Sequence, residues 1–127
     1  RVEEVMRRVE EIARALSVLR LPAAPGEYDM HELVEQALEQ AELPVAHEVR
    51  LGPGRRIDFM CGSVGIEVKK GKPARAAVHR QLRRYALSGA VEALIVVAPG
   101  DLRLPRAIGG VPVRCVALAR LWGVALP

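Results

Sequence analysis

The stretch that most constrains the fold is residues 56–70, RIDFMCGSVGIEVKK, which reads as two short apolar strands separated by a turn. Gly62 provides the backbone freedom that a tight turn needs, so the second strand is expected to return antiparallel to the first. Each strand carries one acid, Asp58 in the first and Glu67 in the second. The hairpin therefore predicts that two carboxylates meet across neighbouring strands.

The alternation of apolar and charged residues predicts which side chains share a face, because successive side chains of a strand point to opposite sides. Ile57 and Phe59 are expected on one face of the first strand, with Asp58 on the other. Glu67 and Lys69 are expected on one face of the second strand. The opposite face of that strand is apolar and consists of Val64, Ile66 and Val68. A lysine is thus expected beside the acids.

These groups suit a site for a hard divalent cation. Two carboxylates and the Val68 carbonyl offer the oxygen ligands that Mg²⁺ prefers. Lys69 would orient or deprotonate a metal-bound water. The residues therefore indicate hydrolysis of a phosphate ester.

The same residues resemble a known family. Asp58, eight intervening residues and then Glu67-Val68-Lys69 are similar to the motif of the PD-(D/E)XK nuclease superfamily, with isoleucine in place of the proline before the aspartate. Gln81-Leu-Arg-Arg-Tyr85 looks like the Gln-x-x-x-Tyr motif of its RecB-like and Cas4-like branch. The resemblance covers about residues 27–98. It implies that the acidic pair binds Mg²⁺ or Mn²⁺, that the lysine serves the attacking water, and that an N-terminal helix adds a further glutamate.

A helix is expected after Gly26, running to about residue 42, before Pro44. Glu27 lies near the edge of the apolar stripe of this helix, so it is our choice for the glutamate that the resemblance implies. An acid at a helix N-terminus also favours the helix dipole without binding a metal, and both interpretations stay open.

A second motif-bearing helix is expected over residues 74–88. Gln81 and Tyr85 are four residues apart and therefore share a face. The resemblance implies that they support Lys69 or a phosphate. The alternative is that Tyr85 belongs to the core and Gln81 to the surface; together with the two acids, the resemblance favours the first interpretation.

Positive charge is concentrated around this motif. Residues 55–84 hold nine Lys/Arg against two acids, and those two are the proposed metal ligands. Such a concentration is typical of a protein that binds a polyanion. With only four aromatic residues in the chain, stacking on bases is not expected to be the main binding interaction. The expected nucleic-acid contacts are Arg56, Lys70, Lys72, Arg80, Arg83 and Arg84.

The 127 residues predict one nuclease-like domain, with an N-terminal amphipathic helix (1–20), a linker (21–26) and a core (27–127). The apolar stripe of the first helix has two explanations, packing on its own domain or sharing across a homodimer. The longest apolar runs are too short for a membrane span, so we expect a cytoplasmic protein. Cys61 and Cys115 lack the spacing of a zinc site.

The strands and helices together predict an α/β fold, a mixed central sheet flanked by helices, similar to the restriction-endonuclease-like core. A first strand is expected over 45–51, with Val45, His47, Val49 and Leu51 on one face, and Glu48 is expected to pair with an arginine. Ala93–Ala98 and Val111–Ala117 are expected as strands buried on both faces. Residues 99–110 are expected as a loop and 118–122 as a final turn. The active site is expected at one edge of the sheet.

The expected function is that of a DNA nuclease dependent on Mg²⁺ or Mn²⁺, working in DNA repair or recombination. The alternative is a nuclease-fold module that binds nucleic acid or assembles without cutting. A third possibility is a structural phosphate or RNA binder whose Glu-Val-Lys-Lys stretch is a solvated strand.

Overall fold

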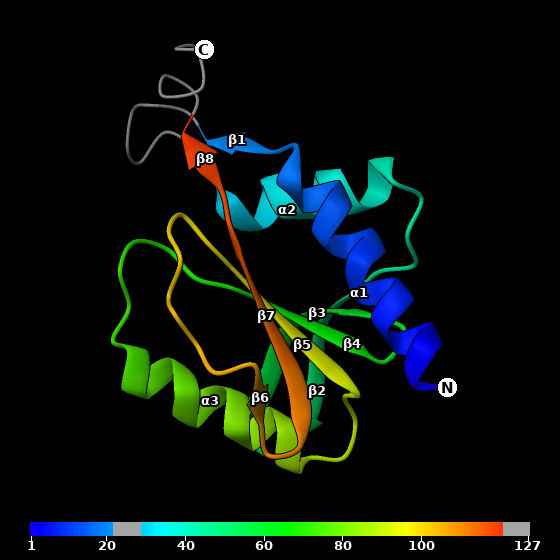
Figure 1. The fold of residues 1–127 in the computed structure, drawn as a ribbon, viewed down its shortest axis with the longest axis vertical. Helices are drawn as coiled ribbons and strands as arrows, with labels where there is room; N and C mark the ends of the chain where they lie inside the picture. The colour runs from blue at the N-terminus through cyan, green and yellow to red at the C-terminus, as the bar shows by residue number, and fades with distance from the viewer. Residues whose placement is uncertain (22–28, 121–127) are drawn as a thin grey trace.

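Among the residues that the structure describes, three helices pack against a six-stranded mixed sheet (Figure 1). The structure is a computed structural model, and it describes residues 1–21 and 29–120. The helices are α1 (Val2–Ser17), α2 (Met30–Gln40) and α3 (Arg75–Leu87). The strands are β1 (Arg20–Leu21), β2 (Ala46–Gly52), β3 (Arg55–Cys61), β4 (Val64–Val68), β5 (Ala93–Ala98), β6 (Ala107–Ile108), β7 (Val111–Ala117) and β8 (Ala119–Arg120). The predicted α/β class, with a mixed sheet flanked by helices, is confirmed.

The sheet has the order β2-β3-β4-β5-β7-β6, with an antiparallel half and a parallel half. The neighbours β2, β3 and β4 pair antiparallel, whereas β4, β5 and β7 pair parallel. Helix α3 provides the crossover from β4 to β5 that a parallel pair requires. All six residues of β5 are buried, as its apolar run predicts. The prediction that β7 is equally buried is wrong, because only the two-residue β6 lies beyond it.

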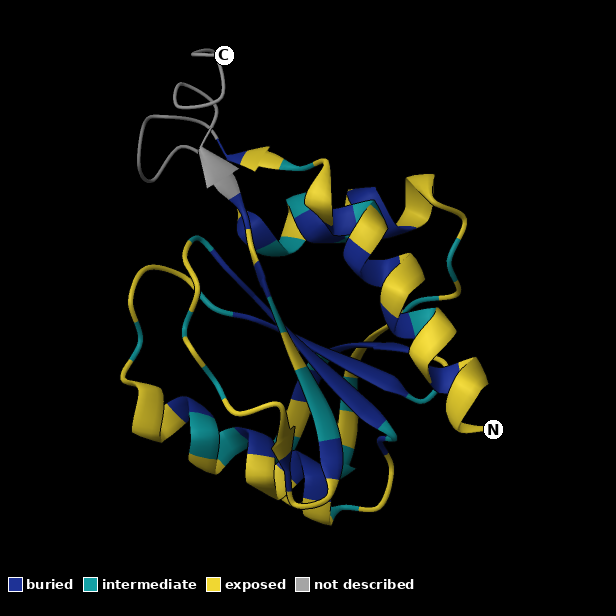
Figure 2. Ribbon diagram, in the orientation of Figure 1, coloured by how far each residue is buried: buried dark blue, intermediate teal, exposed yellow. Residues whose placement is uncertain are grey.

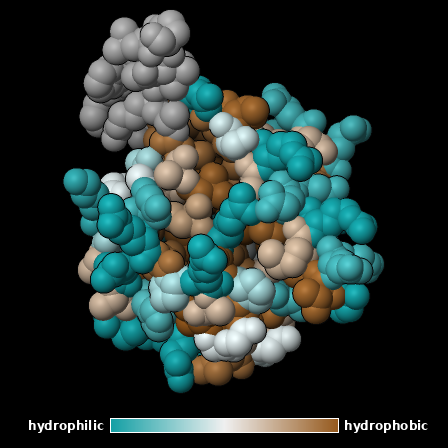
Figure 3. Space-filling model, in the orientation of Figure 1, coloured by the Kyte–Doolittle hydropathy of each residue, from teal (hydrophilic) through white to brown (hydrophobic). Residues whose placement is uncertain are grey.

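The helices form two layers, with α1 and α2 on one face of the sheet and α3 on the other (Figure 1). The buried side of α1 consists of Val5, Val9, Ile12, Ala13 and Leu16, which pack with α2 and the sheet. These residues of the apolar stripe of α1 are therefore covered within its own chain, whereas Val2 and Met6 are exposed, at 73% and 37%. The homodimer stays a prediction. Figure 2 shows the exposed side of α1 facing away from the sheet. Hydrophobic side chains are visible among hydrophilic ones on this face of the molecule (Figure 3).

The predicted face alternation of β3 is wrong. Phe59 packs in the cluster beneath α1 and α2, whereas Ile57 packs in the cluster beneath α3. The faces change between these two residues, at Asp58. Strand β4 keeps the predicted alternation, with Val64, Ile66 and Val68 all in the cluster beneath α1 and α2.

The neighbouring strand β2 also changes faces, at the position opposite Asp58. Val45 packs with the cluster beneath α1 and α2, but Val49 and Leu51 pack with the cluster beneath α3. Between them Glu48 has a φ of 46°, in the left-handed region that strand residues rarely adopt. Glu48 lies between the paired positions His47–Phe59 and Val49–Ile57, and so opposite Asp58. The irregular backbone at Glu48 explains why strict alternation fails on β2.

The remaining differences are at the ends of the chain and around the loops. Strand β1 pairs in parallel with β8, which falls in the predicted final turn. The predicted end of the first helix at residue 20 is wrong, because α1 ends at Ser17 and β1 covers Arg20 and the first linker residue, Leu21. Strand β6 lies inside the stretch predicted as a loop and pairs with β7. None of the helices in residues 1–21 and 29–120 is long and apolar enough to cross a membrane.

Candidate active site

The β3–β4 ladder opens at the two predicted acids. Its paired positions run from Cys61–Val64 to Phe59–Ile66 and stop there. Beyond that point side chains replace the regular pairing. The Val68 N–H donates to Asp58 Oδ2 at 2.7 Å, and the Asp58 N–H donates to Glu67 Oε1 at 3.4 Å.

The predicted meeting of Asp58 and Glu67 is therefore confirmed, and each carboxylate is held by the backbone of the opposite strand. Its predicted position at the edge of the sheet is wrong. Strands β3 and β4 are second and third in the order, with β2 outside them. The pair lies instead at the carboxyl end of β4, where the two strands separate.

Glu67 is the one charged side chain buried in the part of the chain that the structure describes, at 5% exposure. Lys69 Nζ lies 3.3 Å from Glu67 Oε2, which confirms that the two share a face. Burial raises the pKa of Glu67, and the nearby charge of Asp58 raises that pKa further, whereas Lys69 opposes the shift. The two carboxylates therefore repel each other, and the ammonium group of Lys69 offsets part of their charge.

Tyr85 and Gln81 support Glu67 from α3. The Tyr85 hydroxyl lies 3.2 Å from Glu67 Oε1 and 2.9 Å from the Arg56 carbonyl oxygen, and Gln81 Nε2 donates to that hydroxyl at 3.0 Å. Burial, followed by the charge of Glu67, raises the pKa of Tyr85, so the phenol stays protonated and remains a donor. The predicted shared face of Gln81 and Tyr85 is confirmed. Tyr85 contacts Glu67 and Gln81 contacts Tyr85, whereas the resemblance implied contacts with Lys69 or a phosphate.

His31 is the site residue that the sequence analysis missed. Its Nε2 lies 3.3 Å from Asp58 Oδ1. Asp29 caps α2 by accepting from the N–H groups of residues 31 and 32, which places His31 in the first turn of the helix. A lone histidine carries no signal of its own in the sequence. The predicted start of this helix, directly after Gly26, is also wrong, because Asp29 is extended and caps a helix that begins at Met30. Glu27, the predicted helix ligand, lies outside the described residues.

The predicted nucleic-acid contacts form an exposed basic flank. Lys70, Lys72, Arg80, Arg83 and Arg84 are all exposed, on α3 and the loop before it. Arg56 Nη1 lies 3.3 Å from Glu48 Oε1, which confirms that Glu48 has an arginine partner. Between Val68 and Val91 the chain contains no acid, so every charged side chain of this flank is positive.

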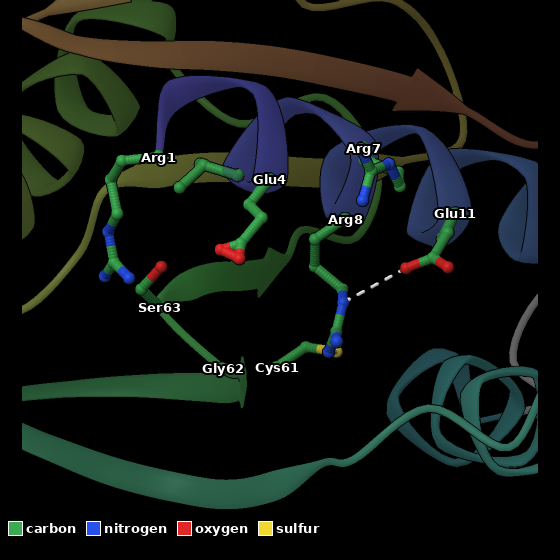
Figure 4. Close-up of a pocket in the computed structure, with 9 residues that line it drawn as sticks. Arg1, Glu4, Arg7, Arg8, Glu11, Cys61, Gly62 and Ser63 are labelled. Atoms are coloured by element: carbon green, nitrogen blue, oxygen red, sulfur yellow. Dashed lines mark hydrogen bonds and ion pairs between the residues drawn. The ribbon is translucent and has the colours of Figure 1, made fainter.

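Two other features bring together polar side chains. A cavity of about 460 Å³ lies between α1 and the turn after β3, where Arg8 contacts Glu11 and the sulfur of Cys61 (Figure 4). It lies at the opposite end of the β3–β4 hairpin from Asp58. Glu35, Glu39 and His47 place potential ligand atoms within 4.8 Å of one another on the surface. Exposed groups of this kind are common without a metal, and we assign none of these residues a role.

Comparison with models of known families, with curated proteins and with solved structures finds no match to this chain. The resemblance to the nuclease superfamily therefore rests on the motif residues of the sequence.

Proposed function

We propose that this chain is a divalent-metal-dependent nuclease that hydrolyses phosphodiester bonds in DNA. The observation that carries the proposal is the opened β3–β4 ladder, which holds Asp58 and Glu67 together with Lys69 at 3.3 Å from Glu67. The closeness of two carboxylates and an ammonium group supports metal-assisted hydrolysis, which uses such groups to hold the metal and to orient water.

The donor set fits Mg²⁺ or Mn²⁺. Asp58, Glu67 and the Val68 carbonyl supply hard oxygen ligands, and Mg²⁺ is usually held by one or two carboxylates with water and phosphate completing its shell. The raised pKa of Glu67 fits a bound cation, because a cation would relieve the repulsion from Asp58. A bound Mg²⁺ or Mn²⁺ would polarise the phosphate and lower the pKa of a coordinated water. A further ligand from the helical layer would be Glu27, as the resemblance implies, or His31, which the structure places beside Asp58.

The residues of the chain divide the remaining work. Lys69 orients the attacking water and stabilises negative charge on the phosphate. Tyr85 fixes the orientation of Glu67 through its hydroxyl, and Gln81 holds Tyr85 in turn. These contacts are preorganised, so the carboxylate needs no rearrangement during the reaction.

The basic flank supports a nucleic acid as the substrate. Lysine and arginine side chains bind phosphates without regard to sequence, so the exposed residues of α3 and the preceding loop would hold the DNA backbone. The composition agrees with this, because an aromatic surface for base stacking is not available in a chain with four aromatic residues.

The test is a gel assay of the full chain on plasmid, linear duplex, single-stranded and four-way-junction DNA, each with Mg²⁺, Mn²⁺ or EDTA. We expect cleavage of at least one substrate with a divalent metal and none with EDTA. The inactive binding module is the competing function. If the folded protein shifts the mobility of DNA but cleaves none of the four substrates, that competing function replaces the proposed one.

A further inference from the structure

A second cavity, of about 470 Å³, lies between the loops that follow β4 and β5. Its cationic lining consists of Lys72, Arg75 and Arg103, against the single acid Asp101. Arg103 is outside the basic stretch of residues 55–84, so charge clustering along the chain does not group it with the nucleic-acid contacts. The fold brings it there because β5 is the direct neighbour of β4.

The cavity lies at the same end of the sheet as the candidate active site. Val68 and Val97 are paired positions of the parallel strands β4 and β5, and the Lys69 N–H donates to the Val97 carbonyl oxygen at 2.8 Å. Both cavity loops therefore leave the sheet at the carboxyl ends of adjacent strands, within a few residues of Lys69. This is the side of an α/β sheet on which ligands commonly bind.

The charges of the cavity are arranged to receive an anion. The Asp101 carboxylate accepts from the backbone N–H of Arg103 at 2.8 Å, so it is engaged in shaping the loop. Arg75 Nη1 lies 3.5 Å from the carbonyl oxygen of Arg103, which brings the two cavity loops together. Among the described residues, no ion pair involves Lys72, Arg75 or Arg103. Their positive charge is therefore available to a bound group.

We infer that this cavity binds a phosphate of the DNA strand beside the phosphate that is cleaved. Arginine is suited to this role because its planar guanidinium can donate two hydrogen bonds to one phosphate. Arg75 and Arg103 act as positioning residues, which hold the strand so that the next phosphate lies at Asp58 and Glu67. The inference rests on the proposed function, since it assigns a path to the substrate of that site.

The experiment measures binding without cleavage. Fluorescence anisotropy with a labelled single-stranded DNA is carried out in an Asp58→Asn background, with and without Arg75→Ala combined with Arg103→Ala. We expect the pair to raise Kd about tenfold or more near 0.1 M salt and to flatten the salt slope by about 1.4, about 0.7 for each lost contact. The matched control is Arg7→Ala combined with Arg14→Ala on the exposed side of α1, which removes the same charge. We expect this control to change Kd by less than about twofold, because screening weakens charges far from the bound strand.

Two results would overturn the inference. One is a Kd for the cavity pair that stays within about twofold of its parent; the other is a control pair that weakens binding as much, which would show a net-charge effect only. Circular dichroism confirms that each variant is folded. Since the assay needs no cutting, its outcome is separate from that of the cleavage assay. A protein that fails to cut but loses binding with the cavity pair would contradict the nuclease and keep the phosphate site.

Discussion

Replacing Tyr85 with phenylalanine tests whether the contacts around Glu67 are as tightly built as the geometry indicates. The hydroxyl accepts from Gln81 Nε2 at 3.0 Å and lies within hydrogen-bond distance of Glu67 Oε1 and the Arg56 carbonyl oxygen, at 3.2 and 2.9 Å. Its single proton serves one of those two acceptors at a time, so the substitution removes two hydrogen bonds at any moment. Tyr85 is only 2% exposed, and water cannot easily replace the lost group.

The expected loss is about 2 kcal/mol in the free energy of unfolding, since a net hydrogen bond contributes about 1 kcal/mol and more when its acceptor is charged. For a domain of 127 residues this corresponds to a fall in Tm of about 7 °C. Urea unfolding followed by far-UV circular dichroism measures the change. Gln81→Met alone, and combined with Tyr85→Phe, completes a double-mutant cycle, in which we expect a coupling of about 1 kcal/mol. A Tyr85→Phe variant within about 0.5 kcal/mol of the parent protein would refute the reasoning, because surface substitutions already fall in that range.

Three further predictions follow from the same geometry. The pKa of Glu67 is raised in the folded protein, so protonated Glu67 contributes to stability. This contribution is fully present when the pH is below the pKa of Glu67 in the unfolded chain, and it is lost as the pH rises through the pKa of Glu67 in the folded protein. In metal-free buffer the free energy of unfolding of Glu67→Gln, measured with urea, should therefore match that of the parent near pH 4 and exceed it at pH 8. A parent that becomes more stable than the variant as the pH rises would contradict this prediction. Gly65→Ala should cost about 2 kcal/mol, because the added Cβ would lie 2.5 Å from the buried Cδ1 of Ile57; unchanged unfolding would show that the site can expand. Arg83→Ala combined with Arg84→Ala should weaken DNA binding about equally for all sequences and flatten its salt dependence; an anisotropy change confined to one sequence would indicate base readout instead.

The hairpin could be predicted from sequence because its information is local. Gly62 fixes the turn, with a φ of 61°, and a tight turn brings the two strands on either side of it next to each other. The Glu67–Lys69 face followed from the period of two, and β4 keeps that period because it pairs with β5 at every position from Val64 to Val68. The buried strand Ala93–Ala98 could also be predicted, because a continuous apolar run needs cover on both faces of the sheet.

The face change of β2 and β3 could not be predicted from the same rule. Alternation assumes an unbroken extended backbone, and the positive φ of Glu48 interrupts it. Valine or isoleucine satisfies either apolar layer, so residues such as Val49 and Ile57 carry no signal for which cluster they join. The face change accompanies the opening of the β3–β4 ladder at Asp58. The departure from regular structure is thus located at the candidate site, where function commonly overrides local rules.

His31 and Arg103 were missed for a different reason. Each is joined to the site by long-range packing, His31 through the position of α2 against the sheet and Arg103 through the neighbouring strands β4 and β5. A lone histidine and a loop arginine have no periodicity by which to be recognised. Only the arrangement of the layers brings them to Asp58 and to the end of β4.

The most direct test of the central claim is plasmid cleavage in Mg²⁺ by the parent protein and by Glu67→Gln, with Glu3→Gln as the matched control on the exposed side of α1. Both substitutions remove one glutamate charge, but only Glu67 lies between Lys69 and Asp58. We expect cleavage by the parent and by the control, and loss of cleavage in folded Glu67→Gln, because removal of a metal-binding carboxylate weakens charge stabilisation at the phosphate. Undiminished cleavage by folded Glu67→Gln would contradict the assignment of this site.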